Sequence, residues 1–212
     1  TGLTVPIFRW VANSDCAQAA QWHRDGHRNL FIAINVSPME LRRTDIADHI
    51  GAALAQSGLD PRHLEIELTE TLIMDGADSF IRALDALKAI GIRIAIDDFG
   101  TGYSSLSYLK RFPVDKVKID RVFVRDLGND ADDAAIVQAI IAMSHHLKLQ
   151  VTAEGVETEE QAAFLRRCRC DILQGFLFGG PVEAARMSAL LDARPLRHRR
   201  GKTGRRPRSP EQ

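Results

Sequence analysis

The sequence predicts an α/β protein built around a parallel β-sheet, and two observations support this prediction. Short β-rich runs alternate with amphipathic helical segments through residues 1–193. Most of these runs are apolar at successive positions, which is typical of parallel strands covered on both faces. Successive β-then-α units form either an open doubly wound sheet or a closed barrel. Because a complete eight-unit barrel takes about 250 residues, a barrel of this length would hold about six of its eight strands.

The expected strands share a short length and a high content of Ile, Val and Leu. In chain order they are Leu30–Val36, Leu64–Leu68, Ile92–Ile96, Lys116–Ile119, Gln150–Ala153 and Ile172–Phe176.

The expected helices have capping residues or an apolar face. Their ranges are 5–25, 45–57, 77–90, 104–110, 131–148, 158–168 and 183–192. Pro6 lies near the first turn of the first helix, and Gly58 and Gly91 follow two later helices. We expect Trp10 and Trp22 to pack in the core. The charges of Asp115, Lys116, Glu159 and Glu160 are expected to form solvated faces.

Composition excludes several classes of protein. Of 212 residues, 45% are hydrophobic and 26% are charged, which excludes a disulfide scaffold, a collagen-like chain and intrinsic disorder for most of the sequence. No apolar run approaches the ~20 residues of a membrane span. The three cysteines lack metal-ligand spacing and indicate a reducing, cytoplasmic compartment, although upstream segments could anchor a longer protein to a membrane. Since the chain begins with Thr1, we expect a fragment or a processed product.

The charge distribution separates a folded domain, residues 1–193, from a tail, residues 194–212. The first part has a net charge of −7, whereas the tail carries eight basic residues and one acidic residue. With glycine, proline and few apolar residues, the tail is expected to be disordered. We favour a solvated extension over a segment that touches nucleic acid or anionic lipid, so no DNA partner is predicted.

Polar side chains lie at or near the carboxyl end of every expected strand. They are Asn35, Glu67, Asp97, Asp98, Lys118, Glu154 and Gln174. Any one of them has an ordinary structural explanation, but in an α/β barrel this rim is where active sites are built. Clustered carboxylates repel one another, so this set requires a cation.

The chemistry of these residues indicates which cation they bind. Asn35, Glu67, Asp97, Asp98 and Glu154 offer only oxygen donors, which suit Mg²⁺ or Mn²⁺ better than zinc. Adjacent aspartates can serve two ions, and two ions about 3.5–4 Å apart form the usual clamp for in-line attack on a phosphodiester. Lys118 fits as a group that stabilises developing phosphate charge or assists the attacking water.

A glycine-containing segment follows the two aspartates and is expected to form a mobile active-site loop. Its residues are Phe99, Gly100, Thr101, Gly102, Tyr103, Ser104 and Ser105. The glycines permit sharp turns, and the hydroxyl groups can reach phosphate. Glu70 is the natural acceptor to hold this loop, although a carboxylate at a helix start is an equally good explanation.

These motifs resemble those of the EAL-domain family of bacterial cyclic di-GMP phosphodiesterases. The matching segments are Asn35-Val36-Ser37, Glu67-Leu68-Thr69-Glu70, Asp97 to Ser105, Lys118-Ile119-Asp120, Ala153 to Glu157 and Gln174-Gly175-Phe176. Their order and intervals agree over residues 2–182. The resemblance implies a TIM-like (β/α) barrel that cleaves cyclic di-GMP to linear pGpG in bacterial signal transduction.

The resemblance also implies roles for individual residues. Asn35, Glu67 and Asp97 would bind one metal ion, and Asp97, Asp98 and Glu154 the second. Lys118 would assist the metal-bound water, and Glu157 and Gln174 would orient it. Glu70 would anchor the loop of residues 99–105, and Phe99 to Ser104 with Asp120 would lie in this loop or against the substrate. A homodimer and an upstream sensory or cyclase domain are the expected partners.

The chain departs from the family pattern at its start. The Glu-Ala-Leu motif and the first two strands would precede Thr1, and Gly180 stands where the family commonly has arginine before proline. We therefore expect weak or no hydrolysis by these 212 residues alone, and recovery when the preceding segment is supplied. Two alternatives remain, namely a non-catalytic module that binds cyclic di-GMP or a protein, and an unrelated Mg²⁺-dependent barrel lyase or enolase-like enzyme.

Overall fold

A computed structural model describes residues 4–43, 45–70, 72, 78–102, 109–127 and 131–193. The chain divides into two compact units, Thr1–Pro181 and Val182–Gln212. The second unit contains helix α10 (Ala184–Ala193) among its described residues. The expected tail, residues 194–212, and most of the expected helix at 104–110 lie outside the described part of the chain.

The first unit is built on a parallel sheet with six described strands. They are β1 (Ile32–Asn35), β2 (Leu64–Thr69), β3 (Arg93–Phe99), β4 (Lys116–Ile119), β5 (Gln150–Ala153) and β6 (Ile172–Leu173). All six expected strands are confirmed, and their ends differ by a few residues from the predicted bounds. The order in the sheet is the order in the chain, β1 to β6, and every neighbouring pair is parallel.

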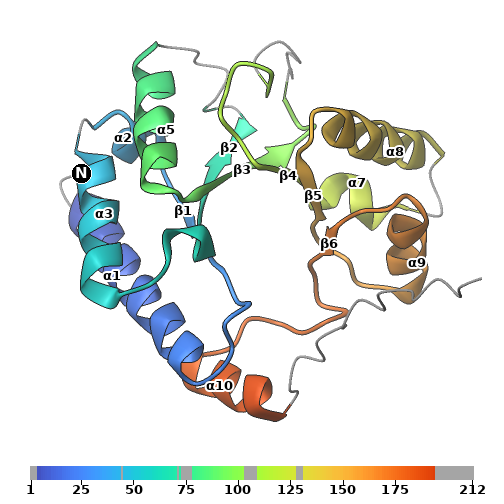
Figure 1. Cartoon of the computed structure of the whole chain (residues 1–212). Helices are drawn as coiled ribbons and strands as arrows, with labels where there is room; N and C mark the ends of the chain where they lie inside the picture. Colours follow the sequence, from blue (N-terminus) through green and yellow to red (C-terminus); the bar gives the residue numbers. More distant parts are fainter. Residues whose placement is uncertain are drawn as a thin grey trace, which may run out of the picture. The chain divides into compact units, whose positions relative to one another are not determined.

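This strand order decides between the two architectures left open by the sequence. An open doubly wound sheet reverses its strand order at a switch point, and this sheet has no reversal. Figure 1 shows the strands following one another along an arc with the helices on its outer side. The first unit is therefore a curled, barrel-type α/β sheet, in which β1 and β6 are the edges of the described arc.

Helices connect the strands, as the sequence predicts. Those of the first unit are α1 (Thr4–Arg24), α2 (Pro38–Leu41), α3 (Ile46–Ser57), the 3-10 helix η1 (Pro61–His63), α5 (Asp78–Ile90), α7 (Arg121–Arg125), α8 (Ala131–His146) and α9 (Glu159–Arg167). The short α2, η1 and α7 were not predicted, because a single helical turn has too few residues to show a periodic apolar face.

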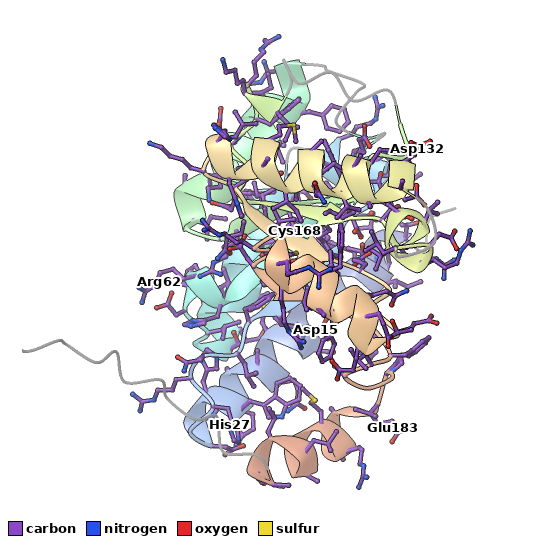
Figure 2. The ribbon with its side chains drawn as sticks, turned by 90° about the vertical axis from the view of Figure 1, so that its right-hand side faces the viewer. Asp15, His27, Arg62, Asp132, Cys168 and Glu183 are labelled. Atoms are coloured by element: carbon purple, nitrogen blue, oxygen red, sulfur yellow. The ribbon has the colours of Figure 1, made fainter. Side chains whose placement is uncertain are left out.

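Local capping determines where several helices begin. At α9, the Thr158 side chain accepts a hydrogen bond from the Gln161 N–H, and Gln161 Oε1 accepts one from the Thr158 N–H. Two acidic residues, including Asp132, lie in the first turn of α8, where the helix dipole favours negative charge (Figure 2).

Two expectations about side-chain environment are wrong. Trp10 is 69% exposed on α1 rather than packed in the core. Lys116 is 2% exposed rather than solvated, and its Nζ lies 2.7 Å from the Glu65 carboxylate. Asp115 is half-buried and accepts hydrogen bonds from Lys88 and the Ile94 N–H, whereas Glu159 and Glu160 are exposed as predicted. The sequence cannot reveal such partners, because they come from other strands and helices.

The core lies on both faces of the sheet. On β2, Ile66 and Leu68 are fully buried on one face, and Glu65 and Glu67 lie on the other, because successive side chains of a strand alternate. On β4, Val117 alternates with lysines in the same way. The face that carries Glu67 and Lys118 is therefore charged, and at its carboxyl-terminal end lies the site described next.

Candidate metal centre at the carboxyl ends of the strands

The strand register gathers the strand-end residues at one rim. Asn35 of β1 lies opposite Glu67 of β2, and Thr69 of β2 lies opposite Asp97 of β3. Glu154 directly follows β5, and its N–H donates to the Ile119 carbonyl at the end of β4. Because all strands are parallel, these carboxyl ends meet at the same edge of the sheet.

Lys118 lies at the centre of this rim. Its Nζ is 2.8 Å from Glu67 Oε1, 2.8 Å from Glu154 Oε1 and 3.0 Å from Asp97 Oδ1. The lysine side chain is 5% exposed and the three carboxylates are between 10% and 19% exposed. A single ammonium group thus faces three acidic groups from three other strand ends, which leaves two negative charges uncompensated.

Burial and the neighbouring charges shift the pKa values of this cluster. Burial alone lowers the pKa of Lys118, but hydrogen bonds with Glu154 and Glu67 outweigh it, so the pKa lies above its ordinary value and the ammonium stays charged. The pKa of Glu67 is raised, mainly by burial, although Lys118 acts in the opposite direction. Burial, together with the charges of Asp97 and Glu65, thus outweighs the effect of Lys118 on the pKa of Glu67.

A β-bulge brings two consecutive aspartates to the same place. Ile96 pairs with Val117 and Phe99 with Ile119, so β3 has one residue more than β4 over this interval. Within the bulge, Asp98 has a left-handed φ of 54°. Adjacent residues of a regular strand point to opposite faces, but here carboxylate oxygens of Asp97, Asp98 and Glu154 lie within 4.8 Å of one another.

The Asp98 carboxyl group also has a perturbed pKa. Burial is the largest cause of its increase, and the charges of Asp97 and Asp120 add to it. A left-handed φ at a residue other than glycine costs free energy, and such strain is found mostly at functional sites. The strained residue here is one of the three whose oxygens converge.

Glu70 contacts the segment that follows the aspartates. Its Oε2 accepts hydrogen bonds from the N–H groups of Gly100 at 2.8 Å and Gly102 at 3.3 Å. Gly100 has a φ of 101°, and a Cβ there would lie 2.8 Å from the Phe123 ring, so only glycine fits. Thr101 Oγ1 donates to the Asp98 carbonyl. Tyr103 and Ser104 lie outside the described residues.

The remaining predicted site residues differ in their surroundings. Asn35, Glu157 and Gln174 are exposed, and the backbone of Gln174 pairs with Ala153 and Val156 beside Glu154. Asp120 caps α7, since its Oδ1 accepts from the Val122 N–H at 2.7 Å.

Phe99 requires a correction. It was expected in the loop or against the substrate, but it is the last residue of β3 and its side chain is 4% exposed in the core. The structure thus places the Phe99 side chain in the apolar interior and Phe99 itself in β3 rather than in the segment that follows it.

Comparison with known proteins identifies the family. The sequence matches the EAL domain over residues 1–181. The chain belongs to the EAL-domain family. The bifunctional diguanylate cyclase/cyclic di-GMP phosphodiesterase MucR of Pseudomonas aeruginosa is 47% identical over 189 residues, which are 89% of this chain and 28% of MucR.

Solved structures of this family have the same fold. The PaMucR phosphodiesterase in complex with c-di-GMP matches with a TM-score of 0.85 and 47% identity, over 88% of this chain and 76% of that chain. A manganese/c-di-GMP complex of Klebsiella pneumoniae BlrP1 matches with a TM-score of 0.71 and 35% identity, over 80% of this chain and 44% of BlrP1. The curled sheet of this chain is thus the EAL form of the TIM-type barrel.

One residue beside the EAL rim was missed by sequence reasoning. Arg121 lines a cavity of about 440 Å³ together with Glu154, Glu157, Gln174 and Phe176. A signal was present, because Arg121 directly follows Asp120 at a strand end. That signal is weak, because a basic residue after a strand is common on protein surfaces.

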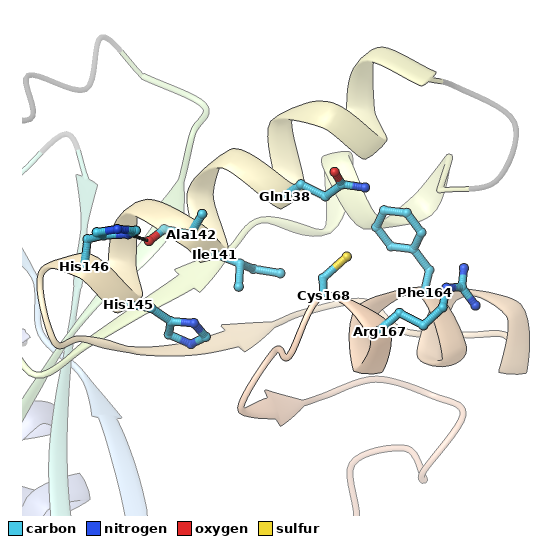
Figure 3. A pocket seen from close by; sticks show the side chains of 8 residues that line it. All are labelled: Gln138, Ile141, Ala142, His145, His146, Phe164, Arg167 and Cys168. Atoms are coloured by element: carbon cyan, nitrogen blue, oxygen red, sulfur yellow. Dashed lines mark hydrogen bonds between the residues drawn. The ribbon is translucent and has the colours of Figure 1, made fainter.

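A second hollow, of about 500 Å³, lies between α8 and α9 of the EAL domain (Figure 3). Its imidazoles have partners, since His145 bonds to Asp171 and His146 to the Ala142 carbonyl. Burial raises the pKa of the Cys168 thiol, which disfavours the reactive thiolate. None of the strand-end carboxylates is among its lining residues, so this hollow is not the metal centre.

Among the residues that the structure describes, none forms a helix that is both long enough and apolar enough to cross a bilayer.

Proposed function

We propose that this EAL domain hydrolyses one phosphodiester bond of cyclic di-GMP to give linear pGpG, with Mg²⁺ or Mn²⁺ bound at the strand-end rim. The observation that carries the proposal is the convergence of Asp97, Asp98 and Glu154 within 4.8 Å beside Lys118. The relatives support the substrate, since MucR is a cyclic di-GMP phosphodiesterase and PaMucR forms a complex with c-di-GMP.

The rim suits hard divalent cations. Its donors are carboxylate and amide oxygens, and the three carboxylates around Lys118 leave an excess of negative charge. We assign Asn35, Glu67 and Asp97 to one ion, and Asp97, Asp98 and Glu154 to a second. When bound, such ions polarise the phosphate and lower the pKa of a coordinated water. A manganese complex of BlrP1 supports the choice of metal.

The protein side chains have separate roles in this proposal. Lys118, held by three carboxylates, provides a fixed positive charge where negative charge develops on the phosphate. Glu157 and Gln174 orient the attacking water, and Asp120 lies beside Asp98 at the substrate side. Glu70 holds the loop that begins at Gly100 through two backbone hydrogen bonds.

The main alternative is an EAL module that binds cyclic di-GMP or a protein without cleaving a bond. The presence of Glu67, Asp97, Asp98, Lys118 and Glu154 favours the enzyme, because metal-dependent cleavage of a phosphodiester requires such oxygen donors beside a positive charge. Membership of the EAL family removes the unrelated lyase from consideration.

The proposal also concerns the neighbouring domains, the oligomeric state and the location of this EAL domain. The chain spans 28% of the length of MucR, which has both cyclase and phosphodiesterase activities, and we infer an upstream sensory or cyclase domain and a homodimer as partners. Cys16, Cys168 and Cys170 are all free thiols, which supports a cytoplasmic, reducing location.

The experiment is an assay of cyclic di-GMP cleavage with Mn²⁺ and with EDTA, followed by chromatography of pGpG. In the chain extended at its amino end, we expect metal-dependent cleavage, and a loss of about 1000-fold in Glu154→Gln, which keeps the shape but removes a ligand charge. Glu159→Gln, a change at an exposed glutamate of α9, is the matched control and should retain activity. Assaying the 212 residues beside the same chain extended upstream in its gene tests the expected weak turnover.

Three results would contradict the proposal. Cleavage that persists in EDTA or in Glu154→Gln would remove the metal centre from the reaction. Metal-independent binding of cyclic di-GMP by both chains, with no pGpG formed by either, would establish the binding module instead.

A further inference from the structure

The hollow between α8 and α9 has no part in the proposed reaction, and it lies on the outer side of the sheet (Figures 1 and 3). Helix α8 ends at His146, shortly before β5 begins at Gln150, and α9 ends at Arg167, shortly before β6 begins at Ile172. The ends of both helices therefore lie near the amino ends of the strands, whereas the metal centre lies at their carboxyl ends. At about 500 Å³, the hollow has the size of a small-molecule site, for which about 300–1,000 Å³ is usual.

The floor of the hollow is apolar. The Ile141 side chain is 2% exposed, and Phe164 is half-buried. Figure 3 shows Ile141 and the Cys168 thiol facing the gap between the two helices. Burial raises the pKa of this thiol, although Arg167 acts in the opposite direction, so Cys168 adds a neutral, polarisable group to the floor. Such a floor suits a flat organic ring.

The chain around the hollow is basic, although residues 1–193 together have a net charge of −7. Residues 138–150 and 161–170 contain no aspartate or glutamate, but they contain Lys148, Arg166, Arg167 and Arg169. Basic residues at the end of a helix offset a partial charge of only about half a unit from each helix dipole. Because four cations exceed the partial charges of two helix ends, this part of the surface favours an anion.

Arg167 is the arginine that lines the hollow. Its guanidinium carbon lies 5.7 Å from the centre of the Phe164 ring, a favourable cation–π contact. Within the described ranges, this guanidinium group donates no hydrogen bond and forms no ion pair, whereas Arg166 lies 3.6 Å from the Glu159 carboxylate. The Phe164 ring thus holds the Arg167 group in place and leaves its N–H donors to a ligand.

The other polar groups of the hollow do not compete for Arg167. The described residues that line it include no carboxylate. Asp171, the acidic residue beside it, accepts hydrogen bonds from His145 Nε2 at 3.0 Å and from the Val151 N–H at 2.9 Å. The exposed Gln138 carboxamide offers both a donor and an acceptor to a ligand.

These groups match a nucleotide with a terminal phosphate. Arginine binds phosphate through two parallel hydrogen bonds, and a phosphate monoester carries a charge of about −1.5 to −2 at pH 7, which suits a site with several cations. The base would lie on the apolar floor, where its polar edge can reach a carboxamide. A nucleoside monophosphate has both parts and is small enough for the hollow.

We propose that the hollow between α8 and α9 binds a nucleoside monophosphate, with its phosphate on Arg167 and its base against Ile141 and Phe164. The site is separate from the strand-end rim, so this inference does not depend on cleavage of cyclic di-GMP.

The first test is isothermal titration of the 212-residue chain with AMP and with GMP in EDTA, which keeps the metal centre empty. We expect one molecule to bind per chain, and Arg167→Ala to weaken binding by about 10- to 100-fold, because hydrogen bonds to a charged group are lost. Arg166→Ala is the matched control, since Arg166 lies in the same last turn but pairs with Glu159, and it should change the affinity less than about twofold.

The parts of the ligand are then titrated separately. Inorganic phosphate and adenosine should each bind at least about tenfold more weakly than AMP, because each lacks one of the two contacts. Phosphate that binds as tightly as AMP would reduce the site to a simple anion site. Adenosine that binds as tightly as AMP would remove Arg167 from recognition, and either result would overturn the proposal.

Alkylation of Cys168 by iodoacetamide, followed by mass spectrometry, tests where the nucleotide binds. At ten times its Kd, AMP should slow this alkylation by about tenfold, because most of the hollows are then occupied. Cys170 is the internal reference, since its thiol donates to the Val151 and Ile172 carbonyls, and its rate should not change.

Several results would overturn the inference. They are the absence of binding of either nucleotide to the wild type at millimolar concentration, equal effects of Arg166→Ala and Arg167→Ala, and unchanged alkylation of Cys168 by the saturated protein. Displacement of AMP by cyclic di-GMP would place the nucleotide at the rim and would also overturn it. A chain that binds AMP in the hollow but cleaves no cyclic di-GMP would contradict only the proposed function.

Discussion

Two lysines on β4, two residues apart, lie on the same face of the sheet and have different surroundings. Lys116 pairs with Glu65 of β2 at 2.7 Å, and the two side chains are 2% and 1% exposed. Lys118 faces Glu67, the next residue of β2 on that face, together with Asp97 and Glu154. One lysine thus has one carboxylate, and the other has three.

The two lysines of β4 thus have different roles, since Lys116 stabilises the fold and Lys118 belongs to the candidate metal centre. The Lys116 layer is neutral and closed, and its ammonium also lies 4.4 Å from the centre of the Phe31 ring, a favourable cation–π contact. Among the described residues, the Lys118 layer has three carboxylates around one ammonium group, which is an excess of negative charge. A neutral buried pair specifies packing, whereas an excess of charge at an open rim requires a cation from solution.

The largest stability effect is expected from breaking the neutral layer. Glu65→Gln leaves the Lys116 ammonium buried without its carboxylate, which should lower the free energy of unfolding by about 3–5 kcal/mol. Urea denaturation at pH 7 measures it. Replacing both partners, Glu65→Leu with Lys116→Met, should recover most of the loss, because well-packed apolar residues can substitute for a buried pair. A stable Glu65→Gln protein with impaired hydrolysis would contradict the division into two layers.

Metal addition should increase the stability of the protein through the Lys118 layer alone. Mn²⁺ at about 100 times its Kd should raise the free energy of unfolding by about 2.7 kcal/mol. Asp98→Asn should reduce this gain, and because asparagine tolerates a left-handed φ, the backbone of the bulge is kept. Thermal unfolding with and without Mn²⁺ provides the measurement. If Asp98→Asn kept the full stabilisation by Mn²⁺ while Glu65→Gln lost it, the metal would bind in the Lys116 layer, and this prediction would be wrong.

The smallest effect is the pH dependence of stability that comes from one pair of histidines. This pair lies near the amino end of β2, whereas the metal centre lies at the carboxyl ends of the strands. His63 of η1 and His23 of α1 are in edge-to-face contact, with ring centroids 4.4 Å apart. Burial lowers the pKa of His63, as do the charges of His23, Arg62 and Arg93, whereas Asp60 raises it.

Because the folded pKa lies below the unfolded one, the unfolded chain binds the proton more readily. Stability should therefore fall as the pH decreases from about 6.5, the ordinary histidine value. His63→Gln should flatten this part of the curve of melting temperature against pH. The change should be equal with and without Mn²⁺, and a metal-dependent change would show that the histidine pair and the rim are coupled.

Much of the site could be predicted from the sequence, for a definite reason. Parallel strands place their carboxyl ends at one edge, so the strand-end positions of Glu67, Asp97 and Glu154 were enough to expect them together. The prediction for Lys116 was wrong. Its charged side chain was expected in solvent, but it is 2% exposed. Its partner Glu65 lies on another strand, 51 residues away in the chain.

The amino-acid sequence by itself determined the six β-rich segments, their helical connections and the chemistry of the oxygen donors, because these depend on local composition and periodicity. Tertiary structure decided the barrel-type strand order, the approach of Asp98 to Asp97 and Glu154, and the placement of Arg121. Those features arise from pairing across strands, where one extra residue in β3 or one close glycine contact redirects a side chain. No local pattern of residues contains that information.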